Sequence, residues 1–346
     1  EPTGAFIVII YGIVSEFGMN GLIVATLMSG IMLVMMGVFK LGTVIKFIPY
    51  PIVVGFTSGI AIVIFSSQVK DFFGLTMGEV PSDFIGKWGA YFSHFSSINI
   101  WATLISVLTI LIIIMAPKIN KRLPGSLLAI VILTVLAFFG KKYFGIEVDT
   151  IGSKFPELAG GSPLPKPVSP KIDGEMIKTL ISPAFTIAIL GAIESLLSAM
   201  VADGTIGKKH NSNTELIAQG VANIVTPMFG GIPATGAIAR TMTNINNGGR
   251  TPVAGIIHSA FLLLIYLFLM PLAVHIPLSC LAGVLAVVSY NMSEWRSFKL
   301  LLSNPRSDVI VLLTTFVLTV VFDLTIAIEV GLIMAIVLFM KRIMET

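Results

Sequence analysis

Long uninterrupted apolar runs dominate the pattern of hydrophobic and polar positions along this chain. Several are about 16 to 22 residues long, enough for a helix to cross a hydrocarbon layer of roughly 30 Å. Clear examples are 22–38, 100–115 and 253–272. A membrane β-barrel would alternate apolar and polar positions over segments of about ten residues, which these runs do not do. The pattern therefore predicts an all-α polytopic membrane protein.

The Pro, Gly and charged residues that interrupt these runs divide the chain into about twelve membrane segments. Five precede a long Pro-rich loop at 141–177, and seven follow it. We expect them near 4–17, 22–39, 50–70, 99–116, 126–140, 178–202, 214–226, 235–246, 253–273, 277–292, 307–322 and 325–341.

Composition and charge support a membrane protein and narrow its partners. The mean hydropathy is +0.96, and only 12% of the residues are charged, against about 25% in soluble domains. The net charge of +4 is scattered over short loops, so nucleic acid is not an expected partner. The single cysteine, Cys280, cannot form an internal disulfide. Because Glu1 directly precedes an apolar helix without an initiator methionine, we expect the chain to be a fragment.

Basic residues in the short connections indicate the orientation, because Lys and Arg stay preferentially on the cytoplasmic side. With twelve crossings, one face carries Lys40, Lys46, 118–122, 208–209, 296–306 and 341–342. That face is predicted to be cytoplasmic. The acidic loop 71–98 then lies outside, whereas the loop 141–177 is an exception, since it carries several lysines on the outer side.

Two similar motifs indicate that the chain contains two related halves. The run Pro-Thr-Gly-Ala-Phe at 2–6 opens one apolar helix, and Pro-Ala-Thr-Gly-Ala-Ile at 233–238 opens another. Pro49 and Gly55 are likewise matched 228 residues later by Pro277 and Gly283. Because the loop charges require the halves to cross in opposite directions, the pattern predicts inverted repeats.

The two Pro/Gly-initiated helices are typical of the discontinuous helices that bind substrate in transporters. Proline has no amide hydrogen to lose at a helix start, and glycine permits close approach to the backbone. Because about half a positive charge resides at each helix start, two starts that meet near the bilayer midplane would bind an anion. The alternative is that both motifs are ordinary turns between complete helices at the membrane surface.

A carboxylate in the segment 178–202 is the candidate for cation coupling. Burying Glu194 in a membrane costs at least a few kcal/mol unless it faces a cavity, a partner or a proton. Ser198 lies four residues on, on the same helical face, so the pair could hold a sodium ion, or the carboxylate could be protonated. The alternative is a structural carboxyl group bonded to neighbouring helices. For Glu329, near the start of an apolar run, we favour a helix-terminus or packing role.

Arg240 is the only arginine inside a predicted membrane segment, one turn after the second broken-helix start. Its guanidinium could attract the substrate anion or neutralise Glu194, and it could also form a structural ion pair or reach the interface. Asp203 and Asn223 are expected to cap or bridge helices near the surface. The four histidines have no metal-ligand spacing, so no metal is predicted apart from a possible Na⁺ at Glu194 and Ser198.

The motifs together resemble the sulfate permease (SulP) family of anion transporters. The run from His210 to Gly255 carries the most specific likeness. The other matching phrases are Pro-Thr-Gly-Ala-Phe at 2–6, Phe-Thr-Ser-Gly-Ile at 56–60 and Asp-Leu-Thr-Ile-Ala-Ile-Glu-Val-Gly at 323–331.

The resemblance implies fourteen segments in two inverted repeats of seven, of which about twelve are expected here. It implies a core domain at 1–48 and 177–275 and a gate domain at 49–176 and 276–346. Two N-terminal helices and a C-terminal STAS domain, which members normally carry, are absent from this sequence. We also expect a homodimer in a bacterial inner membrane.

The resemblance also places residues at the family's site. By this likeness Ala5, Phe6, Glu194, Ser198 and 236–238 line it. Sodium-using bicarbonate transporters of the family have an acidic residue and a hydroxyl group, commonly Asp and Thr, where this chain has Glu194 and Ser198. The longer Glu leaves proton coupling as reasonable as sodium coupling. With the adjoining helix-start residues, the predicted substrate-binding set is Thr3, Gly4, Ala5, Phe6, Glu194, Thr235, Gly236, Ala237, Ile238 and Arg240.

These features predict a core-moving, elevator-like secondary transporter of a small anion such as sulfate, bicarbonate or a dicarboxylate, coupled to Na⁺ or H⁺ and without an organic cofactor. The alternatives are an anion channel, exchanger or voltage-responsive motor on the same scaffold, and a nucleobase:cation symporter. The small apolar Ala237 and Ile238 argue against the symporter. No serine-elbow, GxGD or zinc pattern is present, so the chain is not expected to be an enzyme.

Overall fold

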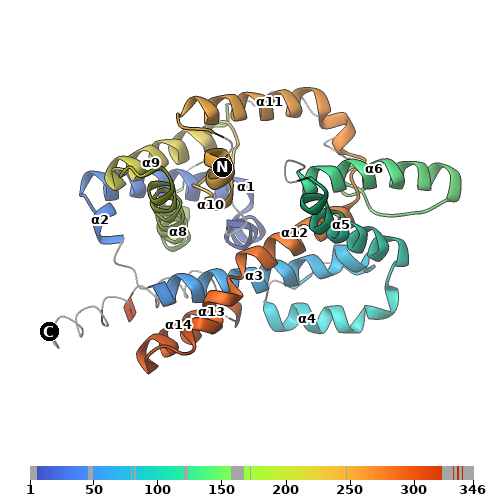
Figure 1. Ribbon diagram of the computed structural model, residues 1–346, viewed down its shortest axis with the longest axis horizontal. Coiled ribbons are helices and arrows are strands. Elements are labelled where there is room, and N and C mark those ends of the chain that lie inside the picture. The colour runs from blue at the N-terminus through green and yellow to red at the C-terminus, as the bar shows by residue number, and fades with distance from the viewer. Residues whose placement is uncertain are drawn as a thin grey trace. The chain divides into compact units, whose positions relative to one another are not determined.

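The computed structural model describes residues 6–45, 50–78, 80–81, 83–120, 124–156, 167–171, 173–246, 248–321, 330, 333–334 and 337. Within these ranges the regular elements are all helical (Figure 1), and the one extended pairing is a single bridge between Thr150 and Pro277. The predicted all-α class is confirmed. In chain order the helices are α1 (Phe6–Val38), α2 (Gly42–Ile45), α3 (Tyr50–Phe73), α4 (Phe84–Ser93), the 3-10 helix η1 (Phe95–Ser97), α5 (Ile100–Ile119), α6 (Gly125–Phe144), α7 (Ile151–Lys154), α8 (Gly174–Ile206), α9 (Ser212–Met228), α10 (Ile238–Asn246), α11 (Val253–Ala273), α12 (Leu278–Met292), α13 (Trp295–Leu301) and α14 (Arg306–Val321).

Six helices in the described ranges are long and apolar enough to cross a membrane, namely α1, α3, α5, α6, α8 and α11. The predicted segments 4–17 and 22–39 fall in the single element α1, which is interrupted at Gly18, where φ is 66° and ψ is −172°. Glycine adopts such a conformation without the steric cost that a side chain would add. The predicted segments 214–226, 277–292 and 307–322 correspond to the shorter helices α9, α12 and α14.

Two predictions fall wholly or largely on residues for which the structure gives no description. Glu329 lies outside the described residues, and so does most of the predicted last segment, 325–341. The predicted segment 235–246 is shorter than expected as a helix, because α10 begins only at Ile238 and residues 231–237 have no regular secondary structure. This short helix with a non-helical approach is the discontinuous element that the motif at 233–238 predicted.

The chain forms two compact units. One comprises 1–59, 165–257 and 295–346, and the other comprises 60–164 and 258–294. Compactness does not establish which parts move together, so the predicted division into core and gate domains stays a prediction.

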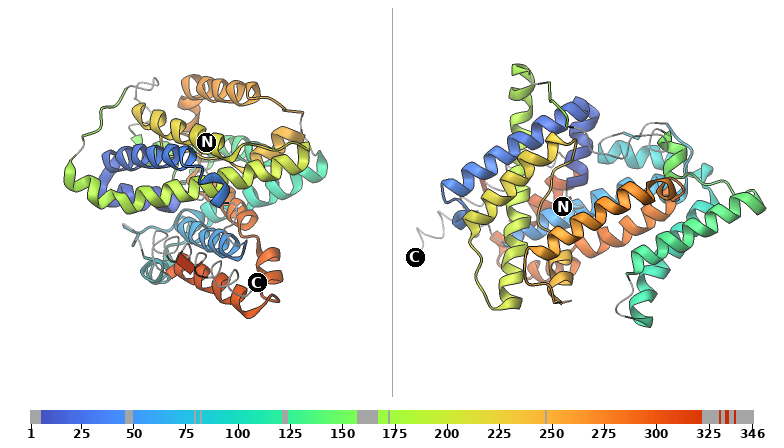
Figure 2. Two further views of the ribbon diagram at one scale, coloured as in Figure 1. Left: turned by 90° about the vertical axis from the view of Figure 1, so that its left-hand side faces the viewer. Right: turned by 90° about the horizontal axis from the view of Figure 1, so that it is seen from above.

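In the first unit, α1 packs against both α8 and α9 (Figures 1 and 2). Leu33 of α1 joins a buried cluster with Ala188, Leu196 and Leu216. Gly30 allows the closest approach, since a Cβ there would lie only 2.8 Å from the carbonyl oxygen of Gly220 in α9. Such small residues are typical of membrane helix interfaces, because they let backbones approach closely.

In the second unit, α12 packs against α5 and α6 (Figure 1). Its core includes Ile105, Leu133 and Cys280. The turn before α12 is fixed by the chain near α7, because the Leu278 amide donates to the carbonyl of Asp149 at 2.9 Å. Part of the predicted outer loop 141–177 is thus an ordered partner of the turn that begins α12.

Gly55 and Gly283, which correspond to each other in the two halves of the chain, occupy equivalent packing positions. A Cβ at Gly55 of α3 would lie 2.6 Å from the carbonyl oxygen of Leu312 in α14, and a Cβ at Gly283 of α12 would lie 2.8 Å from that of Ser106 in α5. In each case the other neighbour is the threonine three residues further along the same helix. Helix α14, which lies after α12 in the chain, therefore contacts α3, and α5, which lies after α3 in the chain, contacts α12. Such reciprocal contacts between corresponding helices are expected of two inverted repeats that pack into each other.

Candidate anion-binding site

The beginnings of α1 and α10 converge on one glycine in the middle of α8. A Cβ built at Gly191 would lie 3.6 Å from Cζ of Phe6 and 3.9 Å from Oγ1 of Thr235. Phe6 is 0% exposed, and Thr235 is buried as well. The Thr235 hydroxyl donates to the carbonyl oxygen of Gly191 at 2.9 Å. Phe6 of the first predicted helix start and Thr235 before the second helix therefore belong to one buried junction.

The non-helical approach to α10 is held by amide side chains of α9. Asn223 accepts a hydrogen bond from the Ala234 amide at 2.9 Å and donates its side-chain amide to the Ala234 carbonyl at 2.8 Å. Gln219, one turn earlier, also donates to the Ala234 carbonyl. Because both backbone polar groups of Ala234 are hydrogen-bonded to a side chain of α9, this residue needs no helical partner before α10 begins.

These contacts correct the expectation for Asn223. It does bridge two elements, but it is 1% exposed and buried, not near the surface. A surface position was expected because a single Asn in a polar-flanked segment gives no measure of depth. The signal that could have located it is the spacing of four residues between Glu215, Gln219 and Asn223, which places the three side chains on one face of α9.

The small residue Gly236 lets the approach to α10 lie directly on α8. A Cβ at Gly236 would lie 3.0 Å from Cα of Ser195 and 3.4 Å from Cβ of Ser198. The backbone amides that follow Thr235 are therefore close to the polar stripe of α8 that the sequence identified around Glu194.

The hydroxyl groups of that stripe have partners on two other helices. Ser195 donates to Oε1 of Glu215 in α9 at 2.6 Å, and Ser198 donates to Oγ1 of Thr241 in α10 at 2.9 Å. Both serines are buried, whereas Glu194, which directly precedes Ser195 on α8, is partly exposed. Ser198 thus links α8 to α10, the helix that the motif at 233–238 opens, a contact that sequence spacing could not show.

The remaining predicted residues differ in position. Ala237 is partly exposed, and Ile238 and Arg240 in the first turn of α10 are exposed. Thr3, Gly4 and Ala5 lie outside the described residues. The junction therefore combines buried anchors with an exposed tip of α10.

The turn between α8 and α9 carries a second polar cluster. Asp203 accepts hydrogen bonds from the His210 ring and from the His210 amide, at 2.7 and 3.0 Å. The other ring nitrogen of His210 lies 3.0 Å from Oγ of Ser212. Asp203 thus bridges the ends of two helices, as expected.

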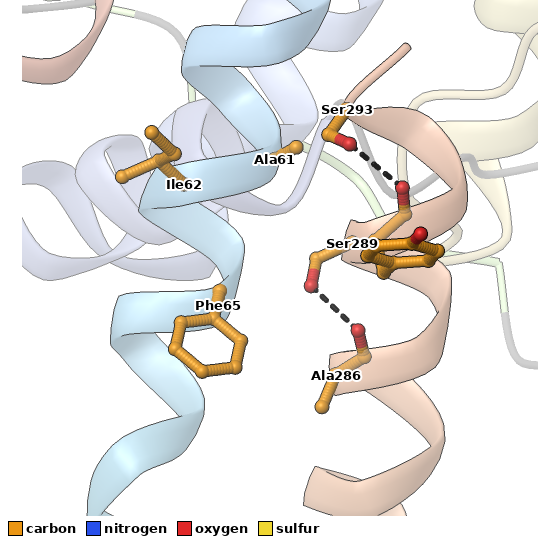
Figure 3. Close-up of a pocket in the computed structure, with 7 residues that line it drawn as sticks. Ala61, Ile62, Phe65, Ala286, Ser289 and Ser293 are labelled. Carbon is orange, nitrogen blue, oxygen red and sulfur yellow. Dashed lines mark hydrogen bonds between the residues drawn. The ribbon is translucent and has the colours of Figure 1, made fainter. Parts of the chain in front are cut away.

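A cavity elsewhere in the chain has different chemistry. It encloses about 210 Å³ between α3 and α12, within the second unit (Figure 3). The hydroxyl groups of Ser289 and Ser293 donate to carbonyl oxygens of their own helix, those of Ala286 and Tyr290. Since these donors are used and the walls are otherwise mostly apolar, the cavity does not resemble an anion site. Its lining residues are Ala61, Ile62, Phe65, Ala286, Ser289, Tyr290 and Ser293.

The helical architecture and its two interlocked repeats define a multi-pass integral membrane protein of the inverted-repeat class. Comparison with known proteins makes the assignment specific. Residues 1–315 match the model of the Sulfate permease family. The chain belongs to the sulfate permease family, as the resemblance predicted.

Individual relatives agree with this assignment. YvdB of Bacillus subtilis (strain 168) is 43% identical over 344 residues, covering 99% of this chain and 64% of YvdB. The bicarbonate transporter BicA of Picosynechococcus sp. (strain ATCC 27264 / PCC 7002 / PR-6) is 32% identical over 352 residues, covering 99% of this chain and 61% of BicA. The chain thus spans less than two thirds of either relative. The family and BicA are named for transport and not for an enzymatic reaction, as predicted.

Solved structures confirm the fold. The transmembrane domain of a cyanobacterial BicA superposes with a TM-score of 0.81 at 30% identity, over 97% of this chain and 83% of that one. The structure of SLC26A9 gives a TM-score of 0.83 at 20% identity, over 94% of this chain and 51% of that one, and it supports the fold alone.

Proposed function

We propose that this chain is membrane-domain sequence of a secondary transporter for a small anion such as sulfate, bicarbonate or a dicarboxylate. The carrying observation is the buried junction at which Phe6, Gly191 and Thr235 meet. Helix starts concentrate unpaired amides and partial positive charge, so a junction of two starts favours an anion without requiring a buried cation. The names of the sulfate permease family and of the relative BicA support this substrate class.

The proposed binding set consists of the backbone near the tip of α10, from Thr235 to Ile238, together with Thr3, Gly4, Ala5 and Phe6. Asn223 supports this set by fixing the Ala234 peptide just before the tip. Arg240, which is exposed on the first turn of α10, would add long-range attraction for the incoming anion.

Cation coupling is proposed for Glu194, by either Na⁺ or H⁺. The carboxylate lies on α8 beside Ser195 and close in sequence to Ser198, and these serines contact α9 and α10. A change in the charge of Glu194 would therefore affect α9 and α10, which hold the proposed anion-binding tip. We further propose that the core moves in an elevator-like manner within a homodimer in a bacterial inner membrane.

The test is radiolabelled anion uptake into proteoliposomes that contain the full-length protein. Sulfate, bicarbonate and fumarate are offered separately, with a sodium gradient, a proton gradient or neither. Saturable uptake of one anion that is driven by one gradient is expected. Uptake that depends only on an opposing anion would indicate an exchanger, and non-saturating flux would indicate a channel, either of which contradicts cation coupling.

Two variants sharpen this test. Glu194→Gln is expected to abolish gradient-driven uptake while the protein stays folded, because the amide can neither bind a proton nor balance a sodium charge. Arg240→Ala is expected to raise the half-saturating anion concentration with little change in gradient dependence. Unchanged driven uptake by Glu194→Gln would remove the coupling role from this residue.

A further inference from the structure

The connection between α3 and α5 contains an amphipathic helix, α4, to which the proposed transport function assigns no role. Its ten residues span about 15 Å, too short to cross a hydrocarbon layer of roughly 30 Å. One face carries Ile85, Gly89 and Phe92, spaced four and three residues apart and therefore aligned. Ile85 is 72% exposed and Phe92 is 70% exposed. A loop surrounded by water would not be expected to present such large apolar side chains together.

The side of α4 that carries Trp88 packs along the end of α3. The Trp88 ring nitrogen donates to Oγ of Ser66 at 3.1 Å, and the rings of Phe95 and Phe73 lie 5.4 Å apart. Phe95 follows Trp88 by seven residues, and Phe73 follows Ser66 by seven. Because the two contacts are seven residues apart in both segments and occur in the same order, α4 and η1 run beside the last two turns of α3 in the same direction.

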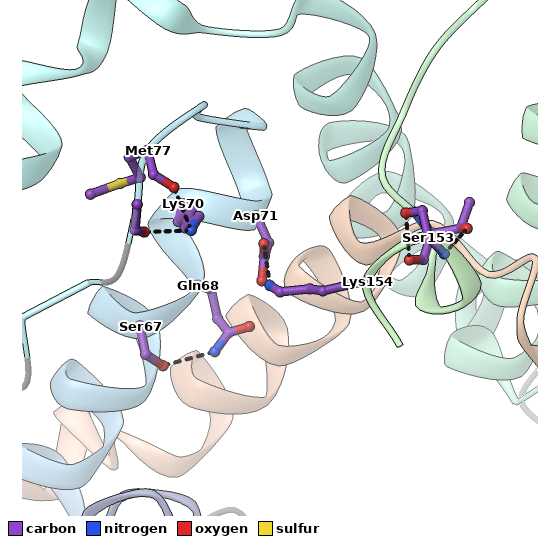
Figure 4. Close-up of polar contacts among 9 residues, drawn as sticks. Ser67, Gln68, Lys70, Asp71, Met77, Ser153 and Lys154 are labelled. Carbon is purple, nitrogen blue, oxygen red and sulfur yellow. Dashed lines mark hydrogen bonds and ion pairs between the residues drawn. The ribbon is translucent and has the colours of Figure 1, made fainter. Parts of the chain in front are cut away.

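Charged residues near the end of α3 indicate the depth of this contact. Lys70 donates to the carbonyl oxygens of Met77 and Gly78, each at 3.0 Å, and Asp71 pairs with Lys154 at 3.3 Å (Figure 4). A helix of 24 residues is about 36 Å long and exceeds the hydrocarbon layer. Its charged last turn therefore lies at the headgroups. Ser66 is one turn deeper, so its partner on α4 lies at the boundary between headgroups and acyl chains.

The charge distribution of α4 fits this depth. Lys87 is the only charged residue of the helix, and it lies on the packed side with an exposed fraction of 7%. Burial lowers the pKa of its ammonium group, while the nearby charge of Asp83 opposes that shift. The outward face carries no charge.

We propose that the face formed by Ile85, Gly89 and Phe92 contacts lipid acyl chains at the membrane interface, so that α4 anchors the segment 74–99 in the bilayer. An uncharged apolar face at this depth, with Trp88 beside it, is suited to the membrane interface, where tryptophan is enriched. The occupant is lipid, because the face is uncharged and the contact between Trp88 and Ser66 places it one turn deeper than the charged end of α3. The inference sharpens the sequence prediction for this loop, which placed 71–98 simply outside.

Site-directed spin labelling of the full-length protein in phosphatidylcholine liposomes tests the proposal. In a Cys280→Ala background, single cysteines are introduced by Ile85→Cys, Gly89→Cys and Phe92→Cys. Gly89→Cys is the least disruptive, because a Cβ there would meet nothing within 4 Å. Glu147→Cys is the aqueous control, since Glu147 is exposed and its carbonyl accepts from Asn99 just before α5. Leu111→Cys, exposed in the middle of α5, is the lipid control.

Power saturation with oxygen and with a water-soluble nickel chelate measures what surrounds each label. The three α4 labels are expected to show a several-fold higher ratio of oxygen to nickel accessibility than the Glu147 label, approaching the Leu111 label. Nickel accessibility equal to that of the Glu147 label would overturn the proposal in favour of a solvated face. Low accessibility to both reagents would overturn it in favour of a protein partner, including a second copy of this chain.

Discussion

The starts of α1 and α10 meet at the same glycine but are held there by different forces. Phe6 at the start of α1 is fixed by apolar packing, with its ring wholly buried near Gly191. The approach to α10 is fixed by hydrogen bonds, from Asn223 to Ala234 and from Thr235 to Gly191. The related halves of the chain therefore use an aromatic anchor in one case and a polar clamp in the other.

The difference separates stability from positioning. Apolar packing depends on volume and tolerates small displacements, whereas paired hydrogen bonds fix the direction of a backbone peptide. Truncating the aromatic anchor, Phe6, should therefore mainly lower the free energy of unfolding. Removing the polar clamp should mainly misplace the amides that the proposed anion would contact.

The largest effect on stability is expected from Phe6→Ala. Truncation of a buried phenylalanine typically costs about 3–5 kcal/mol in unfolding free energy, from lost burial and a residual cavity. Thermal unfolding in detergent should show a clearly lowered midpoint. Phe6→Leu is the matched control and should recover most of the loss. A midpoint unchanged in Phe6→Ala would show that the ring is not an anchor.

Asn223→Ala is expected to lower stability less than Phe6→Ala does, but to reduce anion transport more. Loss of the amide side chain leaves the Ala234 N–H without its partner in the interior, at a cost of about 1–3 kcal/mol. Anion uptake should fall more than the change in unfolding midpoint explains.

Gln219→Ala provides the matched control for this variant. Ala234 keeps both hydrogen bonds to Asn223 when Gln219 is truncated, so uptake should be affected less. Equal uptake by Asn223→Ala and the unmodified protein would argue against a clamp that positions the binding tip.

The smallest effect is expected from Thr235→Val, which keeps the shape but removes the hydroxyl donor to the Gly191 carbonyl. A typical net hydrogen bond contributes about 0.5–1.5 kcal/mol, so the unfolding midpoint should fall only slightly. The half-saturating anion concentration, measured by uptake, should rise modestly. Thr235→Ser retains the hydroxyl group and should match the unmodified protein in affinity. If the Ser variant is as weak as the Val variant, the hydrogen bond is not the relevant contact.

The sequence by itself determined the helical class, most segment positions and the relation between the halves. The apolar runs are longer than those of soluble helices and therefore predict membrane-spanning segments. Within a membrane the backbone can form few structures other than helices. Pro49 with Gly55 and Pro277 with Gly283 retained a detectable repeat because helix starts and close helix contacts admit few other residues. The motif at 233–238 also predicted a broken helix, since its Pro and Gly disfavour a continuous one.

Only the tertiary structure decided which polar residues meet. Sequence spacing placed Ser198 beside Glu194, whereas the fold gives Ser198 a partner on α10 and gives Ser195 the carboxylate of Glu215. The depth of Asn223 likewise became visible only once α9 lay against the segment before α10. The physical reason is that periodicity fixes which face of a helix a residue occupies, whereas its partner depends on contacts between segments distant in the chain.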